Sequence, residues 1–143
     1  MKIVVKAIPF AGVDIQGTIS ADELTIRPEE IKCLEPLVMM GRAEKQGHII
    51  HAWGKAKTRF HYVCARCLAV FDKDFHQDFD FHYAIDAQMT VLDVGEDIRQ
   101  EIILGFPERI LCDEGCRGLC AGCGVDLNVE TCECTKSKKG VKE

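Results

Sequence analysis

Features that would assign this sequence to the membrane or to secretion are missing. No apolar run reaches the roughly 18 residues that a membrane-spanning helix needs. The N-terminal segment MKIVVKAIPFAGVD does not resemble a signal peptide, because Lys6 interrupts its apolar run and no small-residue cleavage site follows. We therefore expect no membrane contact and a cytoplasmic location, where thiols are kept reduced.

Basic charge and catalytic motifs are also lacking. The net charge of -5 and a pI near 5.5 argue against a broad electrostatic grip on nucleic acid, although a local basic patch is compatible with them. The sequence has no Ser-His-Asp order, no phosphate-cradling glycine-rich loop with a lysine, and no convincing acid/base pair. These absences predict that the protein is not an enzyme.

Cysteine, by contrast, is abundant: the chain has nine, and six of them lie between Cys112 and Cys134. In a reducing compartment, close cysteine spacings indicate metal or redox chemistry rather than disulfides. Eight of the nine form four close pairs, each able to supply half of a tetrahedral zinc site. The pairs are Cys64/Cys67, Cys112/Cys116, Cys120/Cys123 and Cys132/Cys134.

The order of the pairs suggests which ones share an ion. Only eight residues separate Cys123 from Cys132, so the last two pairs can close a compact loop around one zinc ion. The first two pairs, Cys64/Cys67 and Cys112/Cys116, then form a second site. This site docks the segment 111–134 on a predicted hairpin whose tip is Cys64-Ala-Arg-Cys67 (CARC). Such a short segment has too little apolar surface to fold alone, so we predict two structural zinc ions.

Other uses of these thiols remain open at this stage. One zinc ion could leave the other thiols free, or the cysteine-rich segment could serve a thiol-based redox enzyme or sensor. Cys116-x3-Cys120-x2-Cys123 also matches the iron–sulfur spacing of radical S-adenosylmethionine enzymes, but those enzymes are much longer barrels of alternating strands and helices. Cys33 stands apart and is expected to be inert.

The hydrophobic pattern predicts a mainly antiparallel sheet. Segments 37–43, 49–63 and 68–83 are predicted strands, and Gly47 marks a turn between the first two. Along 49–63 and 68–83 the side chains follow a period of two, which gives each strand two different faces. Segment 84–92 is expected to be a linker, and an amphipathic helix is predicted at 94–105, with Asp93 as N-cap and Glu96 reaching back in a capping box. The fold class is therefore α+β, with a β domain at 1–110, the cysteine-rich segment at 111–134 and a lysine-rich tail at 135–143.

The two long strands predict their own register. If the CARC turn places Val63 opposite Leu68, Arg59 faces Asp72, Lys57 faces Asp74, and apolar residues meet on the other face. Four residues of the first strand are candidates for contact with RNA, unless they merely face the acids of the next strand. They are Trp53, Lys55, Lys57 and Arg59.

Three motifs together resemble the YceD family. They are Cys64-Ala-Arg-Cys67-Leu68, the segment LGFP at 104–107, and the run from Leu111 to Cys134 with Gly118-Leu119 and Leu127-Asn128 in place. Members are called large ribosomal RNA subunit accumulation proteins. The resemblance implies a role in maturation or stability of 23S rRNA. Our leading hypothesis is that the chain acts by binding rRNA, a ribosomal protein or another assembly factor.

Overall fold

The computed structural model describes residues 1–24 and 30–134, so the predicted lysine-rich tail at 135–143 lies outside the described residues. The chain divides into two compact units. The sheet unit comprises Met1–His61 and Asp72–Phe106, and the cysteine unit comprises Tyr62–Phe71 and Pro107–Glu143. Within the described ranges no helix is long and apolar enough to cross a membrane.

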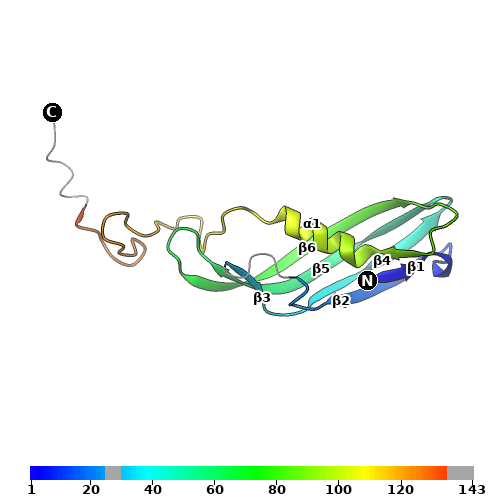
Figure 1. Cartoon of the computed structure of the whole chain (residues 1–143), viewed down its shortest axis with the longest axis horizontal. Coiled ribbons are helices and arrows are strands. Elements are labelled where there is room, and N and C mark those ends of the chain that lie inside the picture. Colours follow the sequence, from blue (N-terminus) through cyan, green and yellow to red (C-terminus); the bar gives the residue numbers. More distant parts are fainter. Residues whose placement is uncertain (25–29, 135–143) are drawn as a thin grey trace, which may run out of the picture. The chain divides into compact units, whose positions relative to one another are not determined.

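The sheet unit is built mainly from antiparallel strands (Figure 1), which confirms the predicted fold class. Its main sheet has the order β2-β4-β5-β3, with β6 also paired to β5. These strands are β2 (Val13–Ile19), β3 (Ile31–Cys33), β4 (Leu37–Gln46), β5 (Ile49–Val63) and β6 (Val70–Ala84). A separate two-stranded ribbon pairs β1 (Lys2–Val4) with β7 (Val91–Asp93), and a short 3-10 helix, η1 (Val5–Ala7), follows β1.

β4 and β5 form a tight hairpin. Gln46 pairs with Ile49, so Gly47 and His48 alone make the turn, and Gly47 has the positive φ of 61° that such a turn requires. The predicted role of Gly47 is confirmed, although β4 runs three residues beyond the predicted end at Ala43.

The period of two in β5 and β6 is confirmed, but the predicted register is wrong by two residues. Arg59 approaches Asp74 rather than Asp72, with 3.8 Å between Nε and Oδ1. Asp72 instead pairs with His61, whose Nδ1 lies 2.6 Å from Oδ1 of Asp72. The cause lies in the hairpin tip, where the Cys64 amide donates to the Ala69 carbonyl and thus lengthens the connection. Because a shift by two preserves side-chain parity, each face keeps its predicted character.

The helix α1 (Val94–Gly105) begins and ends where the sequence predicts. Asp93 caps it, since its Oδ1 accepts from the Glu96 amide at 3.3 Å. Glu96 does not complete the predicted capping box, because its carboxylate accepts from Arg99 and Gln100 instead.

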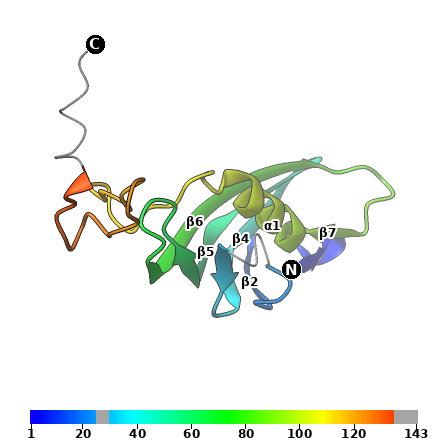
Figure 2. The same ribbon diagram turned by 60° about the vertical axis from the view of Figure 1, so that its left-hand side comes forward.

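α1 lies across one face of the sheet (Figures 1 and 2). Aromatic rings pack together where the helix ends. Phe106, just after the helix, contacts Phe60 edge-on and stacks on Phe75, with ring centroids 5.1 and 5.5 Å apart. Tyr83 donates to Asp97 at 2.8 Å; burial and this hydrogen bond raise the pKa of the Tyr83 phenol well above its usual range.

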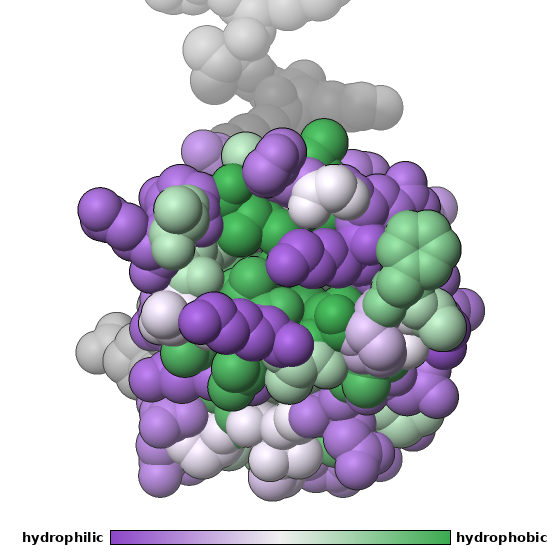
Figure 3. Space-filling view, turned by 90° about the vertical axis from the view of Figure 1, so that its right-hand side faces the viewer, coloured by the Kyte–Doolittle hydropathy of each residue, from purple (hydrophilic) through white to green (hydrophobic). Residues whose placement is uncertain are grey.

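The end of the molecule seen in Figure 3 carries apolar side chains at its centre and polar side chains around them. The sheet unit also has exposed apolar residues on its strands and connections, and two of them, Val4 and Val91, are partners in the β1–β7 ribbon. Those of large size include Val4, Phe10, Met40, Ile49 and Val91.

A pair of glycines lets an aromatic ring reach the backbone of the sheet. Gly41 of β4 lies opposite Gly54 of β5, and Phe79 of β6 is only 3% exposed above them. A Cβ on Gly54 would lie 2.8 Å from Cζ of Phe79 and 2.5 Å from Cα of Gly41, and it would also clash with the Met40 carbonyl. The Phe79 ring therefore fills the space that side chains at Gly41 and Gly54 would occupy.

Replacing Gly54 with alanine should therefore destabilise the sheet. We expect Gly54→Ala to lower the free energy of unfolding by about 1–3 kcal/mol, the usual range for overpacking, in urea titrations followed by far-UV circular dichroism. Gly105→Ala is the matched control, because nothing lies within 4 Å of the added methyl group. Equal stability of the two variants would contradict this account of the packing.

Candidate metal centres

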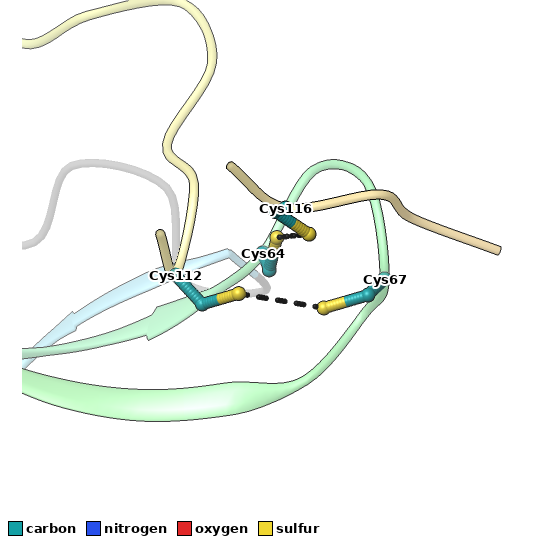
Figure 4. Close-up of side chains that lie close together, drawn as sticks. All are labelled: Cys64, Cys67, Cys112 and Cys116. Atoms are coloured by element: carbon teal, nitrogen blue, oxygen red, sulfur yellow. Dashed lines mark hydrogen bonds between the residues drawn. The ribbon is translucent and has the colours of Figure 1, made fainter. Parts of the chain in front are cut away.

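The structure brings eight cysteines into two groups of four within the cysteine unit. One group contains Cys64, Cys67, Cys112 and Cys116 (Figure 4), and the other contains Cys120, Cys123, Cys132 and Cys134. In each group all four Sγ atoms lie within 4.8 Å of one another. These are the same two sets of four that the spacing predicts.

The separations between sulfurs suit a shared ion. Four zinc–sulfur bonds of about 2.3 Å at tetrahedral angles place the sulfurs about 3.8 Å apart. In the first group Sγ of Cys64 lies 3.8 Å from that of Cys116, and Sγ of Cys67 lies 3.6 Å from that of Cys112. In the second group the Cys120–Cys132 separation is 3.1 Å, still well beyond the roughly 2.05 Å of a disulfide bond.

The two groups are anchored by the same turn, formed once at Cys64–Cys67 and again at Cys120–Cys123. In each, the first cysteine's carbonyl accepts from the amide of the residue after the second cysteine, Leu68 at 3.0 Å and Gly124 at 2.8 Å. In each, the first sulfur accepts from an amide two residues on, Arg66 at 3.5 Å and Gly122 at 3.3 Å. Amides directed at sulfur stabilise thiolate, which is the form that binds metal.

The residue after each turn adopts a left-handed backbone. Gly124 has φ of 76°, which costs glycine nothing, but Leu68 has φ of 60°, which strains a residue with a Cβ. Leu68 is also 62% exposed, so packing offers little compensation. The first turn is thus held in its shape by what surrounds it, and the converging sulfurs are the obvious constraint.

Two residues that the sequence analysis did not single out support the first group. The Arg66 guanidinium donates to the Cys116 carbonyl at 2.9 Å, and Asn128 Nδ2 lies 3.4 Å from Sγ of Cys116. Asn128 is itself oriented by the Arg117 amide, which donates to its Oδ1 at 2.7 Å. Both residues belong to the motifs quoted above, but their roles depend on contacts between distant segments.

The thiols of each group are electrostatically unequal. Burial disfavours the Cys64 thiolate, but hydrogen bonds from the backbone amides of Cys67 and Cys112 outweigh burial and help to lower the pKa of Cys64 to about 6. In the second group the hydrogen bond from Cys132, aided by backbone amides, lowers the pKa of Cys120 to about 6. The same hydrogen bond, aided by burial, raises the pKa of Cys132 to about 12. A dication would favour the thiolate at all four positions.

Very little apolar surface supports the C-terminal segment. Between residues 107 and 134 the buried residues are Cys116 and Gly118. Cys64, Cys67 and Cys116 form the buried centre of the unit, against which Phe71, Leu111 and Leu119 pack partly buried. The sulfurs therefore occupy the place that a hydrophobic core has in a larger domain.

The structure separates the residues of the iron–sulfur spacing. Cys116 joins the first group, whereas Cys120 and Cys123 join the second, so the three do not form one cluster. Cys33 belongs to neither group. It is buried in the sheet unit, where its thiol donates to the Glu35 carbonyl at 3.0 Å.

The four candidate RNA-contacting residues lie on the polar face of β5, in the sheet unit. Arg59 approaches Asp74 and Trp53 stacks on His51 with centroids 4.4 Å apart, so both have neighbours on their own face. Lys55 and Lys57 are exposed and make no ion pair among the described residues. Among these four residues, the positive charge available to a partner therefore comes from Lys55 and Lys57.

The two turns make opposite predictions about glycine. Leu68→Gly should relieve strain and raise the free energy of unfolding of the metal-loaded protein by up to about 1 kcal/mol, whereas Gly124→Ala should lower it by about 1 kcal/mol. Thermal unfolding of both variants beside the unaltered protein checks this. A loss of stability in Leu68→Gly as large as in Gly124→Ala would show that the Leu68 side chain contributes more than its backbone costs.

Comparison with known proteins gives two matches. The family model described as "Large ribosomal RNA subunit accumulation protein YceD" matches residues 53–141, more than half of the chain. Over 52 residues the chain is 33% identical to the "Large ribosomal RNA subunit accumulation protein YCED homolog 1, chloroplastic" of Arabidopsis thaliana. That match covers 36% of this chain and 16% of the Arabidopsis protein.

No solved structure matches the chain. The family model spans the helix and also the CARC turn and the whole cysteine-rich segment, which carry the two groups of thiols. The chain therefore belongs to the YceD family.

Proposed function

We propose that this chain is a non-enzymatic, zinc-binding factor in ribosome biogenesis that supports accumulation or processing of 23S rRNA by binding rRNA or an assembly partner. The role in rRNA follows from the family and from the name of the Arabidopsis relative. The observation that carries the proposal for this chain is the presence of two four-sulfur groups in its cysteine unit.

Zinc is the metal that this donor set suits best. Four thiolates in tetrahedral array select zinc or iron, and zinc is the ion of closed structural sites. Each group is closed by the chain's own sulfurs, which leaves no open position for substrate or activated water. When bound, zinc would supply only cross-links: Cys64 and Cys67 would be tied to Cys112 and Cys116, and Cys120 and Cys123 to Cys132 and Cys134.

This arrangement favours a binding role over catalysis. A closed zinc site fixes a surface and performs no chemistry, so the activity must lie in what the surface recognises. Lys55 and Lys57 offer exposed positive charge to a phosphate backbone, but the neighbouring β6 strand presents Asp72, Asp74 and Asp80 on the same face. An RNA contact here would be local, and a basic assembly protein is the alternative partner.

Metal content tests the zinc proposal. The purified chain should hold about two zinc ions, as four-coordinate sites require, and Cys67→Ser and Cys123→Ser should each lower this number by about one. Cys33→Ser is the matched control and should retain both ions, because Cys33 lies in neither group. Elemental analysis by mass spectrometry of gel-filtered protein gives the number directly.

The competing thiol-redox role predicts a different result. A redox enzyme or sensor would be purified without metal and would form reversible disulfides between these cysteines. Finding iron, or no metal together with disulfides in a folded protein, would contradict the zinc proposal.

The role in rRNA is tested in bacterial cells that lack their YceD protein. The unaltered chain should restore the ratio of 23S to 16S rRNA, and the Cys67→Ser and Cys123→Ser variants should fail because the C-terminal unit no longer holds together. A Lys55→Glu/Lys57→Glu double variant should also fail if this face binds RNA, whereas Lys32→Glu/Lys73→Glu, at exposed positions of other strands, should restore the ratio. An unchanged ratio with the unaltered chain would contradict the proposed role.

A further inference from the structure

Three side chains on the polar face of the sheet unit place their ligand atoms close together. His51 of β5 and Asp80 and His82 of β6 offer two ring nitrogens and a carboxylate oxygen that all lie within 4.8 Å of one another. Nε2 of His51 lies 2.9 Å from Oδ1 of Asp80, and Nδ1 of His82 lies 3.5 Å from the same oxygen. This group is separate from the two groups of four cysteines, which belong to the cysteine unit.

The pairing of the strands explains why these side chains lie together. The two imidazole rings stack across β5 and β6 with centroids 4.2 Å apart and planes 12° apart. Asp80 precedes His82 by two residues, so both side chains emerge on the same face of β6. Neighbouring strands thus hold three donors side by side without help from a flexible loop.

The separations suit a small cation. Bonds of about 2.1 Å at tetrahedral angles place ligand atoms about 3.4 Å apart. The His82–Asp80 separation of 3.5 Å is close to this value, and the His51–Asp80 separation of 2.9 Å is that of a hydrogen bond, which an ion would replace. Two imidazoles and one carboxylate favour a borderline dication such as Zn²⁺, Ni²⁺ or Cu²⁺ over Mg²⁺ or Ca²⁺, which prefer oxygen. The side chains of Asp80 and His82 are 65% and 62% exposed, so an ion can reach them from solvent.

We propose that His51, Asp80 and His82 form a third metal site, one that binds a borderline divalent transition metal through two nitrogens and one oxygen. Three protein ligands leave at least one coordination position for water or for an oxygen of a bound partner. Because its ligands are nitrogen and oxygen and its position is exposed, this site exchanges metal with solvent, unlike the closed cysteine groups.

Trp53 provides a local reporter for this site. It is the single tryptophan of the chain, and its ring stacks on His51 with centroids 4.4 Å apart. Ni²⁺ is paramagnetic and quenches indole fluorescence at short range, so an ion held by His51 should dim Trp53. The probe is Ni²⁺ added to full-length protein whose cysteine groups have first been loaded with zinc.

We expect saturable quenching of Trp53 with one Ni²⁺ per chain. Asp80→Asn and His82→Asn each remove a direct ligand and should weaken the apparent affinity at least as much as loss of a supporting partner does, roughly 10–100-fold. His76→Asn is the matched control, since His76 is exposed on the same face of β6 and has no partner among the described residues.

The result that overturns the proposal is equally specific. Quenching that does not saturate, or that has the same midpoint in His82→Asn as in the unaltered chain, would show that no ion is held by these three residues. Thermal unfolding of the variants with no nickel added should match that of the unaltered chain, because the substituted side chains are largely exposed.

Discussion

The gathering of eight sulfurs into two groups of four is the constraint on which the cysteine unit depends. The segment from 107 to 134 buries only Cys116 and Gly118, so hydrophobic burial cannot offset the entropy lost when these residues become ordered. Metal–thiolate bonds are strong enough to do so, since structural zinc contributes on the order of 10 kcal/mol in small modules. The turn that both groups share, with its amides directed at sulfur, favours the thiolate form that such a bond would require.

The sheet unit is stabilised in a different way, by packing of apolar side chains. β5 and β6 each present one apolar and one polar face, and the apolar faces meet α1 around Phe60, Phe75 and Phe106. On the polar face, side chains of the two strands form pairs such as His61–Asp72 and His51–Asp80. The sheet unit is thus stabilised by burial of its apolar face, and its polar face is available for interaction. The cysteine unit is organised around its sulfur atoms.

Sequence reasoning was accurate where a pattern is local and failed where a partner is distant. The limits of α1, the turn at Gly47 and the division of the cysteines follow from capping, φ preference and spacing. The register of β5 and β6 depended on the length of the CARC connection, which backbone hydrogen bonding at Ala69 extends. The short strands β2, β3 and β7 are fixed by partners far along the chain, and so are the contacts of Arg66 and Asn128 with Cys116.

X-ray absorption at the zinc edge tests the central claim most directly, because it reports the ligands of the metal itself. This account predicts four sulfur neighbours per zinc at about 2.3 Å, with no nitrogen or oxygen in the first coordination sphere of the cysteine-bound ions. The measurement should be made on full-length protein holding two ions per chain. A first sphere with two or more nitrogen or oxygen ligands per zinc would contradict it.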